Sequence, residues 1–376
     1  MKLAFIRTKI QSTVFLDVDS DATETDPQSL EKMKISLKAG SSSKNIIAGL
    51  QKYNLVTGAE EWKLWNGPLK RVALPEQMPV NLFPCEEDLT SQALADYILE
   101  SGQPDILWVE GRDYPAYIKQ IFDLCPNSFK IIYSKHWEPW KVEKLGDYNL
   151  CLVDEDWQIE VVKKKYPAVE CHVWDKLIDY QGLHFPMQVP KKYDLCYVAY
   201  LRSRKKHSLL LNALAEIRDR RLSCIFIGKD RKNNLSRLQA RAQELDHDIA
   251  FVGEVAKGEV NRYINASRIG VMCAKLDAAP RVILEYMAAD VPVLVNARLW
   301  AGGRYVGPAA GRLVPPEDFH HGIIEMLDNL DTFSPRQYFL EHYSFEKVMQ
   351  KFIDILERSG CNIRAHAAEL AENRVN

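Results

Sequence analysis

The most informative stretch of the chain is Asp277-Ala-Ala-Pro-Arg-Val-Ile-Leu-Glu-Tyr-Met-Ala-Ala-Asp-Val-Pro-Val-Leu-Val-Asn296. It follows the apolar run Ile269–Ala274, which is typical of a buried strand, and Pro280 then opens an apolar-periodic helix predicted over 281–289. A helix N-terminus that follows the end of a parallel strand presents unpaired N–H groups and a partial positive charge. The stretch therefore predicts a strand-to-helix junction that suits a phosphate group.

Two carboxylates flank this junction. Asp277 precedes the predicted helix, and Glu285 lies eight residues later, about two turns along it. An anion site between two carboxylates suits a nucleotide-sugar, in which a diphosphate joins two polyhydroxyl rings. On residue types alone, the simpler interpretation is an ordinary helix cap at 277 and a solvated helix carboxylate at 285, because short motifs also match by chance.

Strand-like and helix-like segments alternate on both sides of this junction. In the second half, strands are predicted at 193–201, 222–227, 249–252, 269–274 and 292–295, with helices at 206–219, 234–245, 257–267 and 281–289. In the first half, strands are predicted at 2–6, 71–74, 105–109, 129–133, 150–153 and 170–174, with helices at 88–101, 114–124 and 156–165. This alternation predicts right-handed βαβ units and parallel sheets, with ligands at the carboxyl ends of the strands.

The remaining segments set the boundaries. Residues 8–40 read as a long loop, and the Pro-containing segment 182–192 is the best candidate for an interdomain linker. A helix with apolar residues at helical spacing follows Ser344, and the chain from Gly360 onward is polar. With 376 residues the chain is long for one core, so two domains are expected.

Composition excludes several classes of function. The net charge is −2 and 27% of residues are charged, so no basic excess points to nucleic acid. No apolar run approaches the roughly 20 residues that span a bilayer, and the run at 2–6 is too short for a signal-peptide core. The eight cysteines are scattered without a Cys-x-x-Cys pair, which favours reduced thiols. A cytoplasmic protein is expected.

Several short pieces of the second half occur in a fixed order. They are Lys205–Ala213, Ile225–Gly228, Ile249–Gly253, 277–285, Glu285–Val295, Gly302–Gly303, Gly311–Pro316 and Tyr343–Val348. In this order they resemble the carboxyl-terminal domain and terminal helix of the retaining glycosyltransferases of family 4, which have the GT-B fold. In the first half the resemblance is limited to Ile131–His136 and Lys176–Asp179.

The resemblance implies an α/β fold of the GT-B type, with two doubly wound Rossmann-like domains facing each other across a cleft. Residues 1–182, with a terminal helix at about 345–360 crossing back to them, would bind the acceptor, and residues 193–340 would bind the nucleotide-sugar. The implied activity is a retaining glycosyltransferase, a hexosyl- or related transferase, acting on a carbohydrate-containing acceptor that is a glycan, a lipid-linked compound or a small molecule. Peripheral membrane association stays open.

The same resemblance implies roles for individual residues. Lys205 would contact the donor diphosphate, Asp277 the hydroxyls of the transferred sugar, and His136 that sugar from the opposite domain; these three are the implied catalytic residues. The implied donor-binding residues, with Glu285 on the nucleotide ribose, are Arg202, Arg204, Lys205, Pro280, Arg281, Val282 and Glu285. No metal or other cofactor is expected, since Lys, Arg and a helix N-terminus can stabilise the charge on the diphosphate.

The chain departs from the family pattern at three places. The Arg that the family carries in a Gly-Arg-Leu segment is replaced by Tyr200, and Arg202 or Arg204 could substitute. Asp277 is one methylene shorter than the family's Glu. Ala279 and Pro280 stand where the family commonly has glycines, and a proline cannot donate an N–H to phosphate.

Other motifs favour structural interpretations. The acidic run Asp17-Val-Asp-Ser-Asp21 lacks the Gly and Glu that an EF-hand needs, so a solvated acidic loop is favoured. His320 and His321 have no further ligand nearby and are interpreted as surface residues. Trp137 and Trp140 suit sugar stacking and packing equally. Two further functions stay open: a GT-B protein that binds a nucleotide-sugar or glycan without transfer, and a nucleotide-sugar epimerase.

Overall fold

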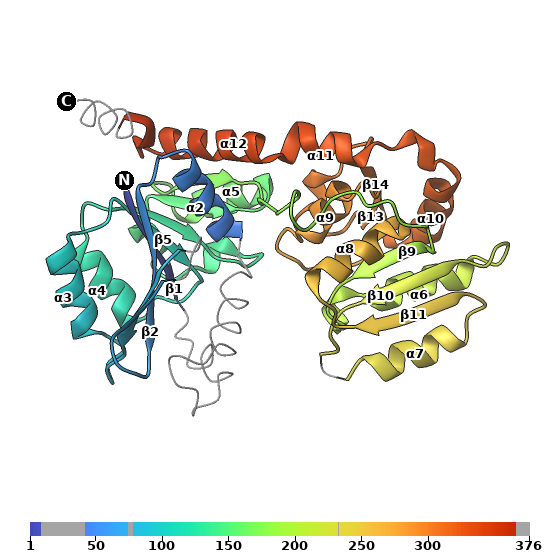
Figure 1. The fold of residues 1–376 in the computed structure, drawn as a ribbon, viewed down its shortest axis with the longest axis horizontal. Coiled ribbons are helices and arrows are strands. Elements are labelled where there is room, and N and C mark those ends of the chain that lie inside the picture. The colour runs from blue at the N-terminus through green and yellow to red at the C-terminus, as the bar shows by residue number, and fades with distance from the viewer. Residues whose placement is uncertain (9–41, 74–77, 232, 366–376) are drawn as a thin grey trace. The chain divides into compact units, whose positions relative to one another are not determined.

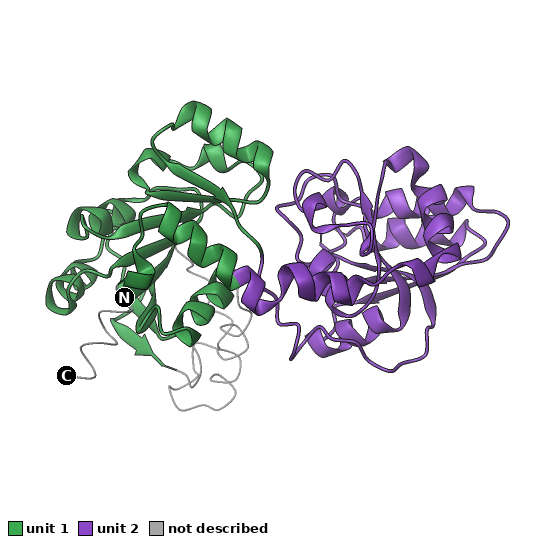
Figure 2. Cartoon of the chain, turned by 90° about the horizontal axis from the view of Figure 1, so that it is seen from above, with its two compact units in different colours: residues 1–175, 349–376 green, residues 176–348 purple. Residues whose placement is uncertain are grey.

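The computed structural model describes residues 1–8, 42–73, 78–231 and 233–365. The described chain forms two compact units (Figure 2): unit 1 comprises residues 1–175 and those from 349 onward, and unit 2 comprises residues 176–348. Each unit is built on one sheet, with helices packed against it (Figure 1). Most of the predicted loop 8–40, and all of the acidic run 17–21, lie outside the described residues.

Unit 1 has an eight-stranded sheet in the order β3-β4-β2-β1-β5-β6-β7-β8. Its strands are β1 (Lys2–Arg7), β2 (Gly58–Trp65), β3 (Lys70–Val72), β4 (Val80–Pro84), β5 (Ile106–Glu110), β6 (Phe129–Tyr133), β7 (Leu150–Val153) and β8 (Glu170–Val173). Its helices are α2 (Ser42–Lys52), α3 (Gln92–Ser101), α4 (Ala116–Leu124), η1 (Pro139–Lys141), η2 (Leu145–Asp147) and α5 (Asp156–Lys165).

The edge of this sheet corrects the sequence prediction. The strand expected at 71–74 as a member of a parallel sheet is β3, which pairs antiparallel with β4. Only seven residues separate β3 from β4, and a parallel connection needs a dozen or more, so an antiparallel pair is the available geometry. Strands β2 and β4 were not predicted.

Strand β2 escaped prediction because its interior carries charge. Glu61 is fully buried, and its carboxylate lies 2.5 Å from Lys44 Nζ and 3.4 Å from Lys63 Nζ. Burial alone would raise the pKa of Glu61, but Lys44, Lys63 and Arg7 outweigh it and hold the pKa below its usual value. A strand that buries a charge network shows neither an apolar run nor regular alternation.

Unit 2 has a six-stranded parallel sheet in the order β11-β10-β9-β12-β13-β14. The strands are β9 (Tyr193–Val198), β10 (Ser223–Ile227), β11 (Asp248–Gly253), β12 (Ser267–Met272), β13 (Val293–Asn296) and β14 (Gly311–Val314). The helices are η3 (Ser203–Lys205), α6 (His207–Glu216), α7 (Leu235–Gln243), α8 (Lys257–Asn265), α9 (Val282–Ala288), η4 (Gly303–Tyr305), η5 (Pro316–Asp318), α10 (Phe319–Asp328), η6 (Leu330–Thr332) and α11 (Pro335–Tyr343).

The predicted series of strands and helices in unit 2 is confirmed to within a few residues at most ends, but it lacked β14, α10 and α11. Strand β14 was not predicted, although Gly311–Pro316 was recognised as a motif, because a four-residue edge strand gives little periodicity. The strand expected at 193–201 ends at Val198, which leaves residues 199–202 in the loop before η3. His320 and His321 lie in α10.

Helix α12 (Phe345–Arg358) begins in unit 2 and from Met349 belongs to unit 1. Within unit 1, the ring of Phe352 stacks on Trp108 at a centroid distance of 5.4 Å, and Trp174 lies 5.8 Å from Trp108. Phe352 is 2% exposed. The amphipathic helix predicted after Ser344 therefore completes the core of unit 1, although it is far along the chain from the other residues of that core.

Replacing Phe352 by Ala should destabilise unit 1 by about 3–5 kcal/mol, because it removes a buried ring and leaves a cavity between Trp108 and Trp174. Urea unfolding followed by Trp fluorescence measures the change. Lys347→Ala, on an exposed position of the same helix, is the matched control and should change the free energy of unfolding by less than about 0.5 kcal/mol. Equal effects of the two substitutions would contradict the packing role.

Candidate functional site

The strand order of unit 2 reverses between β9 and β12. The chain runs outward through β10 and β11 on one side of this pair and through β13 and β14 on the other. Ligands of open parallel sheets bind outside the carboxyl ends of the strands at such a reversal. A pocket of about 330 Å³ lies there, lined by Val198, Ala199, Tyr200, Lys205, Ile227, Gly228, Lys229, Gly253, Glu254, Val255, Val260, Asp277, Pro280, Arg281, Val282 and Glu285.

An ion pair joins the two loops at this reversal. Lys205, at the end of η3 after β9, donates from Nζ to the Oδ2 atom of Asp277, which follows β12. The two side chains are 14% and 15% exposed. Asp277 Oδ1 also accepts from the N–H of Ala278 at 3.0 Å. The pocket thus compensates the partly buried Lys205 ammonium with its own carboxylate.

The strand beneath Lys205 fixes its backbone. Tyr197, buried in β9, donates from its hydroxyl to the carbonyl of Lys205 at 2.5 Å. Burial raises the pKa of Tyr197 well above its usual value, so this hydroxyl remains a donor. Lys206 then takes a left-handed conformation with φ of 54° and begins α6. The position of Lys205 is therefore set by the core and not by the ion pair alone.

The loop before α9 contains Ala279 and Pro280, which stand where the family pattern commonly has glycines. Ala279 has φ of 43°, in the left-handed region that glycine adopts most easily. Gly302 packs against this loop, and a Cβ atom there would lie 2.8 Å from Pro280 Cδ. Residues 279 and 280 thus keep a tight, glycine-like turn without glycines, and the close approach of Gly302 makes room for the proline.

Helix α9 is held against the sheet by Tyr286. Its hydroxyl accepts from the N–H of Val198 at 2.8 Å and donates to the carbonyl of Cys196 at 3.2 Å. Its ring covers Gly270, where an added Cβ atom would lie 2.3 Å from the ring. Because α9 is anchored to both β9 and β12, the neighbouring side chain of Glu285 is fixed beside the pocket.

Glu285 faces a histidine that was not predicted. Its Oε1 atom lies 3.8 Å from Nε2 of His184, which is 8% exposed. Burial lowers the pKa of His184, and the opposing effect of Glu285 is smaller. His184 Nδ1 has no hydrogen-bond partner among the residues that the structure describes. His184 lies in the segment expected to be a linker, so its irregular sequence gave no sign of a role at the site.

Five of the predicted donor-binding residues, Lys205, Pro280, Arg281, Val282 and Glu285, line this pocket together with Asp277, which was predicted as a catalytic residue. Arg202 and Arg204 lie on the same loop but not among the lining residues. The guanidinium carbon of Arg202 lies 5.6 Å from the centre of the Tyr200 ring, and Arg204 is exposed in η3. The third implied catalytic residue, His136, is in unit 1.

His136 follows the carboxyl end of β6. Its ring stacks on Trp137 at a centroid distance of 3.9 Å, and its Nδ1 accepts from the N–H of Glu138 at 3.2 Å. A hydrogen bond from the His136 N–H to Ser134 Oγ, at 3.2 Å, closes the turn. Trp137 thus packs on the histidine that it follows, while Trp140 packs edge-on against Trp157.

The other lining residues had no predicted role, and among them are Tyr200, Lys229, Glu254 and Val255. Lys229 and Glu254 follow β10 and β11 and form an ion pair at 2.7 Å. A glycine followed by a charged residue stands at the end of each strand: Gly228 directly after β10, and Gly253 as the last residue of β11. This repeated pattern could have indicated that Lys229 and Glu254 belong to the site, because the carboxyl ends of neighbouring parallel strands meet at one edge of the sheet.

Comparisons with known proteins agree with this geometry. Residues 184–337 match the family model described as glycosyl transferases group 1. Sucrose-phosphate synthase from Thermosynechococcus elongatus superposes with a TM-score of 0.66 at 14% identity, covering 95% of this chain and 98% of that one. The fold is GT-B. The matched domain together with the GT-B fold supports a glycosyltransferase.

Two other GT-B structures were solved with nucleotides. HepE from Anabaena, in complex with UDP, has a TM-score of 0.65 at 12% identity, covering 95% of this chain and 100% of that one. The pneumococcal O-GlcNAc transferase GtfA, in complex with UDP and GlcNAc, has a TM-score of 0.62 at 10% identity, covering 96% and 99%. No curated protein matches the sequence.

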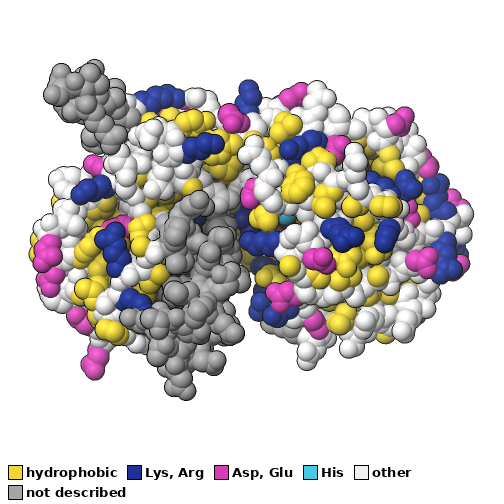
Figure 3. Space-filling view, in the orientation of Figure 1, with side chains coloured by type: hydrophobic (Ala, Val, Ile, Leu, Met, Phe, Trp, Pro, Cys, Tyr) yellow, Lys and Arg dark blue, Asp and Glu magenta, His cyan; other side chains and the backbone are white. Residues whose placement is uncertain are grey.

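Other features of the described residues complete the comparison with the sequence. On the face seen in Figure 3, basic and acidic side chains are interspersed, as the small net charge suggests. Cys85 is half-buried, the other cysteines are buried, and all eight are free thiols. Within the described ranges, no helix is long and apolar enough to cross a membrane, and no cluster of three or more metal-ligating side chains occurs.

Unfolding of the GT-B chain should depend on the protonation of His207, which is 2% exposed beneath the Lys205 loop. Burial lowers its pKa from 6.5 to about 4. The unfolded state therefore binds more protons than the folded state below about pH 6.5. The free energy of unfolding consequently decreases as the pH is lowered. The contribution of His207 to this loss should reach about 3 kcal/mol at pH 4.

Urea titrations between pH 7 and pH 4 measure this slope. His207→Gln should be less stable at pH 7 but lose less stability on acidification than the unsubstituted chain. His321→Gln, at an exposed position of α10, is the control and should keep the original slope. A slope that is unchanged in His207→Gln would contradict the assignment.

Proposed function

We propose that the chain is a retaining glycosyltransferase that moves a sugar from a nucleotide-sugar donor to a carbohydrate-containing acceptor. The observation that carries the proposal is the convergence of Lys205, Asp277, Arg281 and Glu285 on one pocket, at the strand-order reversal of unit 2. The matched family model and the GT-B fold support glycosyl transfer. The retaining outcome rests on the resemblance of the 277–285 segment to family 4.

The donor diphosphate would lie between Lys205 and Arg281. Both side chains line the pocket, one from each side of the reversal, so their charges can stabilise the leaving phosphate. A Lys ammonium is a mobile point charge, and an Arg guanidinium presents donors in a planar fork. With these cations the proposed reaction uses no metal ion or other cofactor.

The nucleoside would occupy the opposite end of the pocket. Glu285 can accept hydrogen bonds from both hydroxyls of the ribose. The lowered pKa of His184 favours its neutral ring. That ring would shield one side of the Glu285 carboxylate from water without forming an ion pair with it. The base would then lie between the ends of β10 and β11, beside Lys229 and Glu254.

The transfer replaces one bond to the anomeric carbon of the sugar by another. The bond from that carbon to the diphosphate oxygen breaks, and a bond to the acceptor oxygen forms on the same face. The acceptor's proton leaves with the diphosphate. Asp277 would hold hydroxyls of the transferred sugar once Lys205 has turned to the phosphate. As the family resemblance implies, His136 would also contact that sugar.

A second candidate is a GT-B protein that binds a nucleotide-sugar without transferring the sugar. The observation in its favour is that the Lys205 ammonium is already paired with Asp277, while Tyr200 stands where the family carries a phosphate-binding Arg. Binding of donor without release of nucleoside diphosphate, across a broad panel of acceptors, would favour this candidate. Product analysis without acceptor separates both functions from an epimerase.

Turnover should depend on Glu285 and Lys205. With a donor found by thermal-shift screening of nucleoside diphosphates and their sugars, Glu285→Gln should lower kcat/KM by roughly 10- to 100-fold, the loss of a charge-assisted hydrogen bond. Lys205→Ala should lower kcat by about 100- to 1,000-fold, because its charge counts most in the transition state.

The measurement is release of nucleoside diphosphate in the presence of acceptor. Glu244→Gln and Lys192→Ala carry the same changes at exposed positions outside the pocket and should retain activity. Full activity in both Glu285→Gln and Lys205→Ala would show that the pocket is not the donor site.

Removing the internal competitor should strengthen nucleotide binding. In Asp277→Asn the Lys205 ammonium is no longer paired with a carboxylate, so UDP or another nucleoside diphosphate should bind roughly 5- to 30-fold more tightly, equivalent to about 1–2 kcal/mol. Turnover should nevertheless fall, because the contact with the transferred sugar is lost. Isothermal titration calorimetry measures the first effect, and weaker binding in Asp277→Asn would contradict the competition.

A further inference from the structure

A second pocket lies within unit 1, at the amino ends of its strands. It measures about 240 Å³ and is lined by Lys2, Leu3, Gly58, Ala59, Glu60, Trp62, Arg71, Pro79, Tyr97, Ser101, Gly102 and Pro104. Lys2 begins β1, Gly58 begins β2, Pro79 precedes β4 and Pro104 comes shortly before β5. The pocket shares no residue with the donor pocket, and its size suits a small compound.

The single carboxylate of this pocket is already satisfied. Glu60 accepts from Trp62 Nε1 at 2.6 Å, from Asn81 Nδ2 at 2.7 Å and from the hydroxyl of Tyr97, which lies 2.9 Å from both carboxylate oxygens. These donors come from β2, β4 and α3. Because a carboxylate has about four acceptor positions, little capacity remains for a ligand. Glu60 therefore fixes the wall and orients Tyr97.

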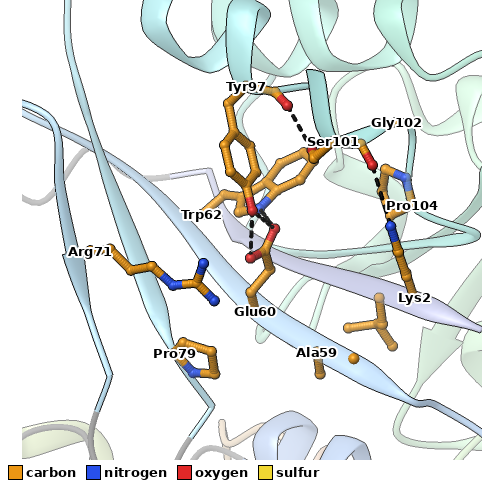
Figure 4. A pocket seen from close by; sticks show the side chains of 12 residues that line it. Lys2, Ala59, Glu60, Trp62, Arg71, Pro79, Tyr97, Ser101, Gly102 and Pro104 are labelled. Atoms are coloured by element: carbon orange, nitrogen blue, oxygen red, sulfur yellow. Dashed lines mark hydrogen bonds between the residues drawn. The ribbon is translucent and has the colours of Figure 1, made fainter. Parts of the chain in front are cut away.

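The cations of the pocket have unused hydrogen-bonding capacity. Arg71, an exposed residue of β3, makes no side-chain hydrogen bond or ion pair with any described residue, which leaves five N–H donors for a ligand. The Lys2 ammonium donates to the carbonyl of Ser101 at 3.3 Å. Figure 4 shows Arg71 and Lys2 on opposite sides of the pocket, with Tyr97 and Trp62 between them.

Charge and shape together define the ligand. Two cations outnumber one carboxylate among the lining residues, so the pocket favours an anion. Its remaining walls are apolar or aromatic, formed by Leu3, Ala59, Trp62, Pro79, Tyr97 and Pro104. A cationic ligand would be repelled by Arg71 and Lys2, and a purely apolar one would leave the donors of Arg71 unused.

We propose that this pocket is a second ligand site, which binds a small organic anion consisting of a carboxylate or phosphate group on a flat apolar ring. The oxyanion binds the fork of Arg71 through two parallel hydrogen bonds, as guanidinium groups bind carboxylates and phosphates. The ring packs against Tyr97 and Pro79. The pre-set hydrogen bonds of Glu60 keep the Tyr97 ring in place before the ligand arrives.

Isothermal titration calorimetry of the full chain at pH 7 tests the site with three probes that share a phenyl ring: benzoate, phenyl phosphate and the neutral benzamide. The unsubstituted chain should bind at least one of the two anions and not benzamide, and the anion bound more tightly identifies the head group. Arg71→Met should weaken that binding at least tenfold, the loss of charge-assisted hydrogen bonds. Arg71→Lys keeps the charge but not the planar fork, so its affinity for the anion should lie between those of the unsubstituted chain and Arg71→Met.

Two control variants locate the binding. Arg241→Met removes the same charge at a half-exposed position of α7, and Lys205→Ala removes a cation from the donor pocket. Both should bind the anion as the unsubstituted chain does. The proposal is overturned if neither anion binds, if benzamide binds equally well, if Arg71→Met binds without loss, or if Lys205→Ala abolishes binding.

Discussion

The arrangement of the pocket at the strand-order reversal of unit 2 depends on the hydrogen bonds of one buried hydroxyl. Tyr286 ties α9 to the backbone of β9 at Val198 and Cys196, while its ring fills the space above Gly270 in β12. The two strands on either side of the strand-order reversal are thereby joined to the helix that follows one of them. Burial raises the pKa of this hydroxyl and keeps it a donor. The side chains that line the pocket from α9 and from the loop after β9 are therefore held at a fixed spacing.

Charged side chains at this pocket are compensated in pairs. Lys205 and Asp277 bond to each other, and Lys229 bonds to Glu254 at the other end of the same pocket. A nucleotide-sugar supplies both a diphosphate for the cation and hydroxyls for the carboxylate, so binding would replace one internal pair by two contacts with the ligand. In unit 1 the buried carboxylate of Glu61 is likewise compensated within the protein, by three surrounding cations.

Sequence reasoning succeeded where local pattern and structure coincide. The apolar run before Asp277 and the periodicity after Pro280 predicted β12 and α9 to within a few residues, because a buried strand and an amphipathic helix impose their own periods. It missed β2, whose buried Glu61 hides the apolar pattern, and β14, which is too short to show one. It also missed His184, because an irregular segment carries no periodic signal.

The sequence by itself determined the order of strands and helices in unit 2 and the residue types available for a diphosphate site, since both follow from local periodicity and from short motifs. Only the tertiary structure decided which of those residues meet. Lys205 and Asp277 are far apart in the chain and pair because β9 and β12 are neighbours in the sheet, while Arg202, three residues from Lys205, does not line the pocket. Strand pairing brings distant residues together, and no local pattern encodes it.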